Sequence, residues 1–206
     1  MPIIAIVGNK GGAGKTTLSV NLAAGISNQS SIAVIDADPQ GSSLQWRAIA
    51  GDNVHFPVYA STFSLKQQAE SYSSKNDVVL IDCPPSVKSP QTVSVLEFAD
   101  IALIPVQPSP MDLWATVHIE KAVAEARETN PELKALLVIN QLESRTTLSK
   151  LVREVLNEIA LPVAETAIRR RAIYRNSALE GKSVFGIGKR GADAVEEINS
   201  LIQEVV

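Results

Sequence analysis

Short, almost wholly apolar runs alternate along the chain with longer segments in which apolar residues recur at helical spacing. Unbroken runs of Val, Ile and Leu are typical of strands that are covered on both faces of a parallel sheet. The predicted strands are Ile3–Val7, Ile32–Ile35, Val54–Tyr59, Val78–Ile81, Ile101–Val106, Leu136–Ile139 and Val163–Thr166. The predicted helices are Thr16–Ser27, Gly41–Ala50, Leu65–Ser73, Thr92–Phe98, Leu113–Glu128, Leu148–Ala160, Arg171–Leu179 and Ala192–Val205. This alternation predicts an α/β fold with a mostly parallel sheet of about seven strands.

Composition and the continuity of the pattern indicate how many folding units the chain contains. Of its 206 residues, 45% are hydrophobic and 20% are charged, which favours a compact globule over an extended disordered chain. No repeat, low-complexity tract or long linker interrupts the pattern, so we expect a single domain over residues 1–206. The first apolar run ends at Gly8, too early for a membrane span, and the lone Cys83 excludes an internal disulfide framework. We therefore expect a cytoplasmic protein.

A glycine-rich loop follows the first predicted strand, with the sequence GNKGGAGKTT at residues 8–17. Glycines allow the backbone N–H groups of such a loop to converge on a triphosphate, and the N-terminus of the following helix adds its dipole. Lys15 would then reach the β- and γ-phosphates, and the Thr16 hydroxyl would face Mg²⁺. A simple flexible turn would not account for a Lys-Thr pair at this point. The predicted nucleotide-binding residues of the loop are Lys10, Gly11, Gly12, Ala13, Gly14, Lys15, Thr16 and Thr17.

Acidic residues stand at the ends of two further predicted strands. Asp36 and Asp38 belong to the segment DADPQ at residues 36–40, and Asp82 directly follows the apolar run Val78–Ile81. Such carboxylates at strand ends suit a network of Mg²⁺ and water, including an attacking water. An ordinary turn is the alternative for the Asp-Pro pair, but the phosphate-binding loop upstream favours a metal site. Thr16 and Asp82 are therefore predicted to hold Mg²⁺.

These motifs resemble those of the ParA/MinD family of dimerising P-loop ATPases, and the resemblance runs through nearly the whole chain. Asn9 stands where the common Walker A pattern has its first glycine, and the loop matches the deviant pattern K-G-G-x-G-K-[ST]-[ST] instead. The segment DADPQ likewise matches the D-x-D-P-Q segment of the family. The resemblance implies ATP and Mg²⁺ as cofactors and catalytic roles for Lys10, Lys15 and Asp38. Lys10 would reach the phosphates on the partner subunit, and Asp38 would orient the attacking water. Asp36 would support Mg²⁺ and so complete a metal site with Thr16 and Asp82.

Two less specific assignments follow from the same resemblance. The proline-containing segment at residues 103–112 matches one that borders the base and the dimer interface in the family. Asn140 ends a predicted strand at the place where the family often has an asparagine that contacts adenine. Prolines that stiffen a loop, and an asparagine that caps one, are the alternatives.

Charge is distributed unevenly along the chain, whose formal net charge is −3. Residues 169–190 contain seven basic side chains and one acidic side chain, a local charge of +6, whereas the rest of the chain carries −9. A basic surface of this kind can bind DNA phosphates without reading the base sequence. A solvated basic face, or arginines paired with acids from elsewhere in the chain, are the alternatives. The predicted DNA-binding residues are Arg169, Arg170, Arg171, Arg175, Lys182, Lys189 and Arg190.

Features that the chain lacks favour the small partition type within the family. One cysteine cannot serve the cluster-binding relatives, and residues 191–206 hold four acids and no base, which disfavours direct membrane binding. The first strand has no helix-turn-helix segment before it, so sequence-specific DNA binding is not expected.

The resemblance therefore implies a nucleoid-associated ATPase that forms a homodimer with ATP and binds double-stranded DNA non-specifically. It would position or partition a plasmid, a chromosome locus or a protein compartment such as a carboxysome. Its slow hydrolysis would be stimulated by a separate cargo adaptor. A metabolic ATP-dependent ligase or synthetase, and a MinD-like spatial regulator that acts through another protein, are the alternatives.

Overall fold

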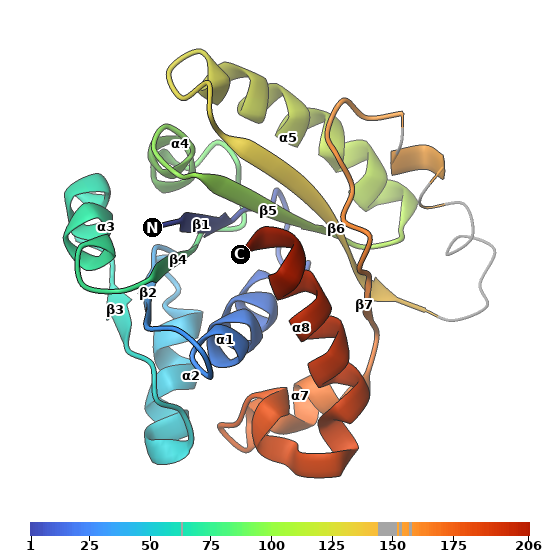
Figure 1. Ribbon diagram of the computed structural model, residues 1–206. Coiled ribbons are helices and arrows are strands. Elements are labelled where there is room, and N and C mark those ends of the chain that lie inside the picture. Colours follow the sequence, from blue (N-terminus) through green and yellow to red (C-terminus); the bar gives the residue numbers. More distant parts are fainter. Residues whose placement is uncertain (63, 144–151, 153, 157) are drawn as a thin grey trace.

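The computed structural model describes residues 1–62, 64–143, 152, 154–156 and 158–206, and it contains one seven-stranded sheet (Figure 1). The strand order is β3-β2-β4-β1-β5-β6-β7, and every neighbouring pair is parallel. The strands are β1 (Ile3–Ile6), β2 (Ile32–Asp36), β3 (Val58–Ala60), β4 (Val78–Asp82), β5 (Ile101–Val106), β6 (Lys134–Leu142) and β7 (Ile168–Arg169). The predicted α/β class with a parallel sheet is confirmed.

Helices cover both faces of this sheet, as the unbroken apolar strands require (Figure 1). Ala5 and Val7 of the β1 region pack in the cluster beneath α3, α4 and α5, whereas Ile4 and Ile6 pack in the cluster beneath α1, α2 and α8. The α-helices are α1 (Lys15–Ile26), α2 (Ser42–Ala50), α3 (Leu65–Ser73), α4 (Pro90–Leu96), α5 (Pro110–Arg127), α7 (Ala172–Leu179) and α8 (Ala192–Val205). Short 3₁₀ segments occupy η1 (Gly51–Asn53) and η2 (Val184–Gly191).

Two of the predicted strands were placed wrongly. Within the predicted strand Val54–Tyr59, pairing begins only at Val58, although Val54 and Phe56 are buried, and Phe56 stacks on Trp46 with ring centroids 6.0 Å apart. Burial in this segment therefore comes from core packing and not from strand pairing.

The last strand is Ile168–Arg169 and not Val163–Thr166, where Val163 forms only an isolated bridge with Leu137. The backbone N–H groups of Glu165 and Thr166 donate to the Glu204 carboxylate of α8, at 2.8 and 2.7 Å. A side chain of α8 thus replaces the strand ladder at these two residues.

Two helices, α4 and α5, each begin at a proline, a few residues before the start that the apolar periodicity predicts. α4 begins at Pro90 and α5 at Pro110, each after a serine whose hydroxyl accepts a backbone N–H of the first turn, from Thr92 and Asp112. Six of the 13 residues of the predicted helix Leu148–Ala160 lie outside the described part of the chain. Of the described ones, residues 152 and 154–156 are helical, whereas residues 158–160 are not, so the predicted end at Ala160 is too late. None of the described helices combines the length and apolar character needed to cross a membrane.

The parallel register gathers the predicted site at one edge of the sheet. Asp82, at the end of β4, is the register partner of both Ile6 and Asp36. The phosphate-binding loop follows β1, and the segment after Asp36 follows β2, so both emerge beside Asp82. This is the carboxyl edge of the sheet, where open α/β folds bind their ligands.

Candidate nucleotide-binding site

The phosphate-binding loop, residues 8–14, connects β1 to α1. Gly12 and Gly14 have φ values of 81° and 88°, a conformation that glycine adopts without steric cost. At Gly14 an added Cβ would also clash with Nδ2 of Asn140. The loop therefore adopts left-handed backbone conformations at Gly12 and Gly14. At Gly14 it also passes too close to β6 to leave room for a side chain.

Lys15, the first residue of α1, is 7% exposed and lies against the inside of the loop. Its Nζ donates a hydrogen bond to the carbonyl of Lys10 at 3.3 Å. Burial lowers the pKa of Lys15, and the negative charges of Asp82 and Asp38 oppose this effect. An anion held by the loop would stabilise this desolvated ammonium group further.

Three side-chain amides hold the carbonyl groups of the loop. The carbonyl of Gly12 accepts hydrogen bonds from Nε2 of Gln107 at 2.6 Å and from Nε2 of Gln141 at 3.1 Å. The carbonyl of Ala13 accepts from Nδ2 of Asn140 at 2.7 Å. Sequence reasoning missed the roles of Gln107 and Gln141. Their positions in the sequence could have indicated these roles, because Gln107 and Gln141 stand at the carboxyl ends of β5 and β6, beside the loop.

Asp82 is the acidic centre of the site. Its carboxylate accepts hydrogen bonds from the hydroxyls of Thr16 at 2.8 Å, Ser43 at 2.7 Å and Ser19 at 3.1 Å. Burial raises the pKa of Asp82 to about 6, although the bonds from Ser43 and Thr16 oppose the shift. The predicted pair Thr16 and Asp82 is therefore in direct contact, and Ser19 and Ser43 were not foreseen.

These oxygen donors fit a magnesium ion. Mg²⁺ is usually held by one or two protein oxygens together with water and phosphate oxygens. Within the described residues, no group of three or more His, Cys, Asp or Glu side chains could hold a metal ion. Thr16 and Asp82 offer a hydroxyl and a carboxylate beside the phosphate-binding loop, and this number of protein oxygens suits an ion that also binds water and phosphate.

Asp36 and Asp38 differ in their surroundings. The two carboxylate oxygens of Asp36, which is 2% exposed, accept the backbone N–H groups of Asp38 at 3.1 Å and Leu44 at 2.9 Å. Burial raises the pKa of Asp36, and these bonds oppose the shift. Asp38 is half-buried, and within the described residues its carboxylate accepts a single hydrogen bond, from the N–H of Gln40 at 3.0 Å. Asp36 therefore fixes the segment between β2 and α2, and Asp38 is the more available carboxylate.

Lys10 points away from the inside of its own loop. Its Nζ lies 3.2 Å from Oδ2 of Asp112 in the first turn of α5, and its side chain is 51% exposed. The two lysines of the motif therefore occupy different positions, with Lys15 buried beneath the loop and Lys10 at the protein surface.

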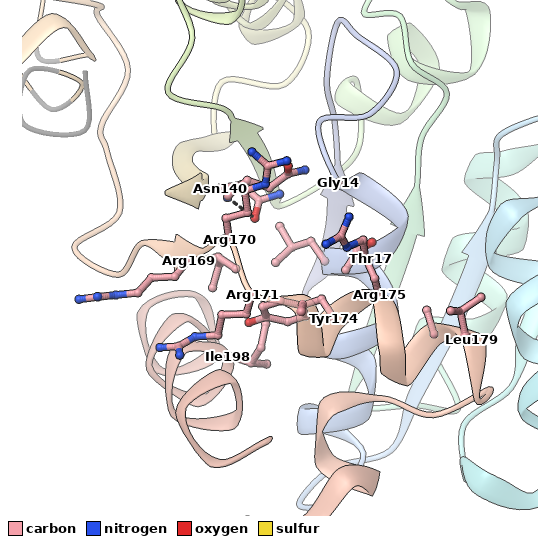
Figure 2. Close-up of a pocket in the computed structure, with 15 residues that line it drawn as sticks. Gly14, Thr17, Asn140, Arg169, Arg170, Arg171, Tyr174, Arg175, Leu179 and Ile198 are labelled. Atoms are coloured by element: carbon pink, nitrogen blue, oxygen red, sulfur yellow. Dashed lines mark hydrogen bonds between the residues drawn. The ribbon is translucent and has the colours of Figure 1, made fainter. Parts of the chain in front are cut away.

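A cavity of about 860 Å³ adjoins the loop where the loop passes into α1 (Figure 2). Gly14, Thr17 and Leu18 form one wall, and Asn140 lies at the end of β6 between that wall and the basic segment. The opposite wall includes Ile168, Arg169, Arg170, Arg171, Ala172, Tyr174 and Arg175. Much of the predicted DNA-binding segment therefore borders the space next to the phosphate-binding loop.

Acidic side chains pair with four of the seven predicted DNA-binding residues. Arg171 donates to Glu197 at 2.7 Å and to Asp193 at 2.8 Å, and these bonds raise its pKa. The further pairs are Arg169 with Glu197, Arg170 with Glu143, and Lys182 with Glu180. Within the described residues, Arg175, Lys189 and Arg190 have no ion pair, and all three are exposed.

Comparison with known families identifies the class of protein that this fold and loop define. Residues 4–184 match the family described as the CobQ/CobB/MinD/ParA nucleotide binding domain, and the chain belongs to this family. The resemblance to ParA/MinD ATPases is thereby confirmed.

Individual relatives lie within the same group. "Maintenance of carboxysome distribution protein A" of Halothiobacillus neapolitanus is 39% identical, over 98% of this chain and 95% of that protein. "Chromosome-partitioning ATPase Soj" of Thermus thermophilus is 28% identical, over 98% of this chain and 96% of that protein. A solved structure of a McdA variant from Cyanothece in complex with ATP has a TM-score of 0.75 at 17% identity, over 99% of this chain and 95% of that one. The structural likeness shows a common fold.

Proposed function

We propose that this chain is a dimerising switch ATPase that positions a cargo on the nucleoid. The observation that carries the proposal is the contact between Thr16 and Asp82 beside the buried amine of Lys15. It brings together the hydroxyl, the carboxylate and the cation that Mg²⁺ and ATP require. The 39% identity with a carboxysome distribution protein, over nearly the whole chain, supports the positioning role and favours a carboxysome as the cargo.

Nucleotide binding would use groups that the fold already holds in place. The loop N–H groups would bind phosphate oxygens, and Lys15 would exchange the Lys10 carbonyl for a β- or γ-phosphate oxygen. Thr16 and Asp82 would hold Mg²⁺, which offsets the charge of the phosphates when bound. Asp36 would keep the segment after β2 in position, and the less constrained carboxylate of Asp38 would orient the attacking water.

The exposed amine of Lys10 supports a role in dimerisation. Two stacked triphosphates carry a large negative charge, and a lysine from each partner would offset it. ATP would then form part of the interface between two copies of this single domain, residues 1–206. Hydrolysis, stimulated by a separate cargo adaptor, would remove that link and open the dimer.

Lys189 and Arg190 support DNA binding in the dimer, because both are exposed and form no ion pair within the described residues. Phosphate contacts need only positive charge on one surface, and dimerisation would double that surface. The protein would therefore be cytoplasmic and nucleoid-associated, without direct membrane binding.

The test is binding to long, unrelated double-stranded DNA with ATP, with ADP and without nucleotide, at low and moderate salt. We expect binding with ATP alone, and a steep loss of affinity as salt rises. Lys15→Ala, which should bind no nucleotide, is the matched control.

Other outcomes point to the alternatives. An ATP dimer, confirmed by light scattering, that binds no DNA would contradict the nucleoid role and favour a regulator acting through another protein. ATP turnover that depends on a small acceptor and ignores DNA would favour a ligase or synthetase.

A further inference from the structure

We infer that Arg175, although it belongs to the basic segment, binds the nucleoside end of ATP and makes the site selective for a nucleotide over bare triphosphate. The inference rests on the proposed function, because it takes the phosphate-binding loop to hold ATP. It moves one arginine from the predicted DNA surface to the nucleotide site.

The first observation is the position and shape of the cavity of about 860 Å³. It begins at Gly14 and Thr17, where the loop passes into α1, so it adjoins the end of the loop that holds phosphates. Leu18 and Ile168 give it apolar walls, and Asn140 adds a polar group. The arginines of the opposite wall add positive charge. A cavity of this volume that combines apolar walls with polar and charged groups suits a small polar ligand. The ribose and base of a nucleotide whose phosphates lie in the loop would occupy it.

The second observation is the direction in which the cavity arginines point. Arg175 stands on α7, and its guanidinium lies beside Thr17 (Figure 2). Arg169 and Arg171 extend away from that end of the cavity in the same view. Both of them pair with Glu197 of α8. Arg170, the fourth arginine of the cavity, lies near Asn140 and pairs with Glu143. Of the four arginines, Arg175 is therefore the one that lies beside Thr17 and forms no ion pair within the described residues.

The third observation is the lack of a protein partner for this cation. Among the described residues, no carboxylate or carbonyl group accepts a hydrogen bond from Arg175. Arg171, by contrast, donates to two acidic side chains, Glu197 and Asp193. A guanidinium group offers several donors in one plane as well as a flat face that stacks on aromatic rings. Ribose hydroxyls and a purine ring match both properties, so a bound nucleoside would provide the contacts that the protein does not.

The experiment compares two ligands that share their phosphates but differ in the nucleoside. Binding of ATP and of inorganic tripolyphosphate, each with Mg²⁺, is measured by calorimetry for the wild type, Arg175→Ala and Arg175→Lys. We expect Arg175→Ala to weaken ATP binding about tenfold, the effect typical of one hydrogen bond to a charged donor. Tripolyphosphate affinity should stay unchanged, which also shows that the variant is folded. Arg175→Lys should restore only part of the ATP affinity, because it lacks the planar group.

Two further variants serve as controls. Asn176→Ala changes the next exposed residue of α7, which does not line the cavity, and Lys66→Ala removes an exposed charge from α3. Both should bind ATP and tripolyphosphate like the wild type.

Three results would contradict either the inference about Arg175 or the proposed function, and the experiment distinguishes them. ATP affinity unchanged by Arg175→Ala, together with weaker DNA binding, would overturn the inference and return Arg175 to the DNA surface. An equal loss of ATP and tripolyphosphate affinity would place Arg175 on the phosphates and overturn the selectivity. A wild-type protein that does not bind ATP would contradict the proposed function itself.

Discussion

Lys10 and Asp112 form an ion pair within one chain, with Nζ of Lys10 3.2 Å from Oδ2 of Asp112. The aspartate is fixed, since its backbone N–H donates to the hydroxyl of Ser109 that caps α5, and its side chain is only 6% exposed. The lysine is half-exposed, so it is the partner that can move. Lys10 is thus paired inside its own subunit. If it reaches the phosphates of a second subunit, as we propose, dimerisation must break that pair.

Replacing Asp112 by asparagine should therefore favour the ATP-dependent dimer. A partly exposed ion pair contributes about 0.5–1 kcal/mol, so Asp112→Asn should lower the ATP concentration needed for half-maximal dimerisation roughly two- to fivefold. Light scattering over a range of ATP concentrations measures the effect. Glu125→Gln is the control, because it removes an exposed carboxylate from the same helix and leaves the pair of Lys10 with Asp112 intact. If Asp112→Asn dimerises less readily than the wild type, the pair supports the dimer and the argument is wrong.

Asp82 should lower the stability of the ligand-free protein at neutral pH. Because burial raises its pKa from 3.8 to about 6, the folded state keeps a proton between about pH 4 and 6 that the unfolded chain has released. The free energy of unfolding therefore falls as pH rises through this window. Asp82→Asn should raise it by about 1–3 kcal/mol at pH 7 and change it little at pH 4. Denaturant titrations at the two pH values measure the difference.

The same substitution should remove the stabilisation that ATP and Mg²⁺ confer, if Asp82 holds the ion. The thermal midpoint of the wild type should rise with both ligands, and that of Asp82→Asn should not. Asp52→Asn removes the same charge from the exposed η1 segment and should alter neither result. A variant that is still stabilised by ATP and Mg²⁺ would remove Asp82 from the metal site.

Local pattern was sufficient for much of the fold and for the placement of the site. The unbroken apolar runs before Gly8 and Asp82 indicate strands that are buried on both faces of a parallel sheet. Because parallel strands end at the same edge of the sheet, the residues that follow these two strands lie close together. This explains why the contact between Thr16 and Asp82, 66 residues apart in sequence, follows from motifs alone.

Contacts made by side chains from distant elements were not predictable in the same way. Glu204 replaces a strand ladder at Glu165 and Thr166, and nothing near either segment indicates this. The charge of residues 169–190 was visible, but its pairing with acids of α8 depends on how that helix packs. The pair of Arg171 with Glu197 therefore required the structure.

The amides that hold the loop should contribute to ATP affinity. Gln107 and Gln141 each donate to the Gly12 carbonyl, and one hydrogen bond contributes roughly 0.5–1.5 kcal/mol. Replacing both glutamines by alanine should therefore weaken ATP binding about tenfold, because the loop loses its preferred conformation. Calorimetric titration with ATP measures the change.

Gln141 offers an internal control, since its φ of 57° is unusual for a residue other than glycine. Gln141→Gly and Gln141→Ala both lose the amide, so they should weaken ATP binding equally. The glycine variant should be the more stable of the two by about 1 kcal/mol, because glycine adopts this conformation freely. Wild-type affinity in both variants would show that the amide of Gln141 does not organise the loop.

Trp114 should report dimerisation by its fluorescence. It is 69% exposed on α5, two residues after Asp112, with Met111 and Val117 also exposed on the same helix. If Lys10 leaves Asp112 to reach a second subunit, the start of α5 must face that subunit, and Trp114 loses solvent. In a Trp46→Phe background, Trp114 is the only tryptophan. ATP with Mg²⁺ should shift its emission to shorter wavelength and reduce quenching by acrylamide, whereas ADP should do neither. Unchanged quenching in a dimer confirmed by light scattering would place the interface elsewhere.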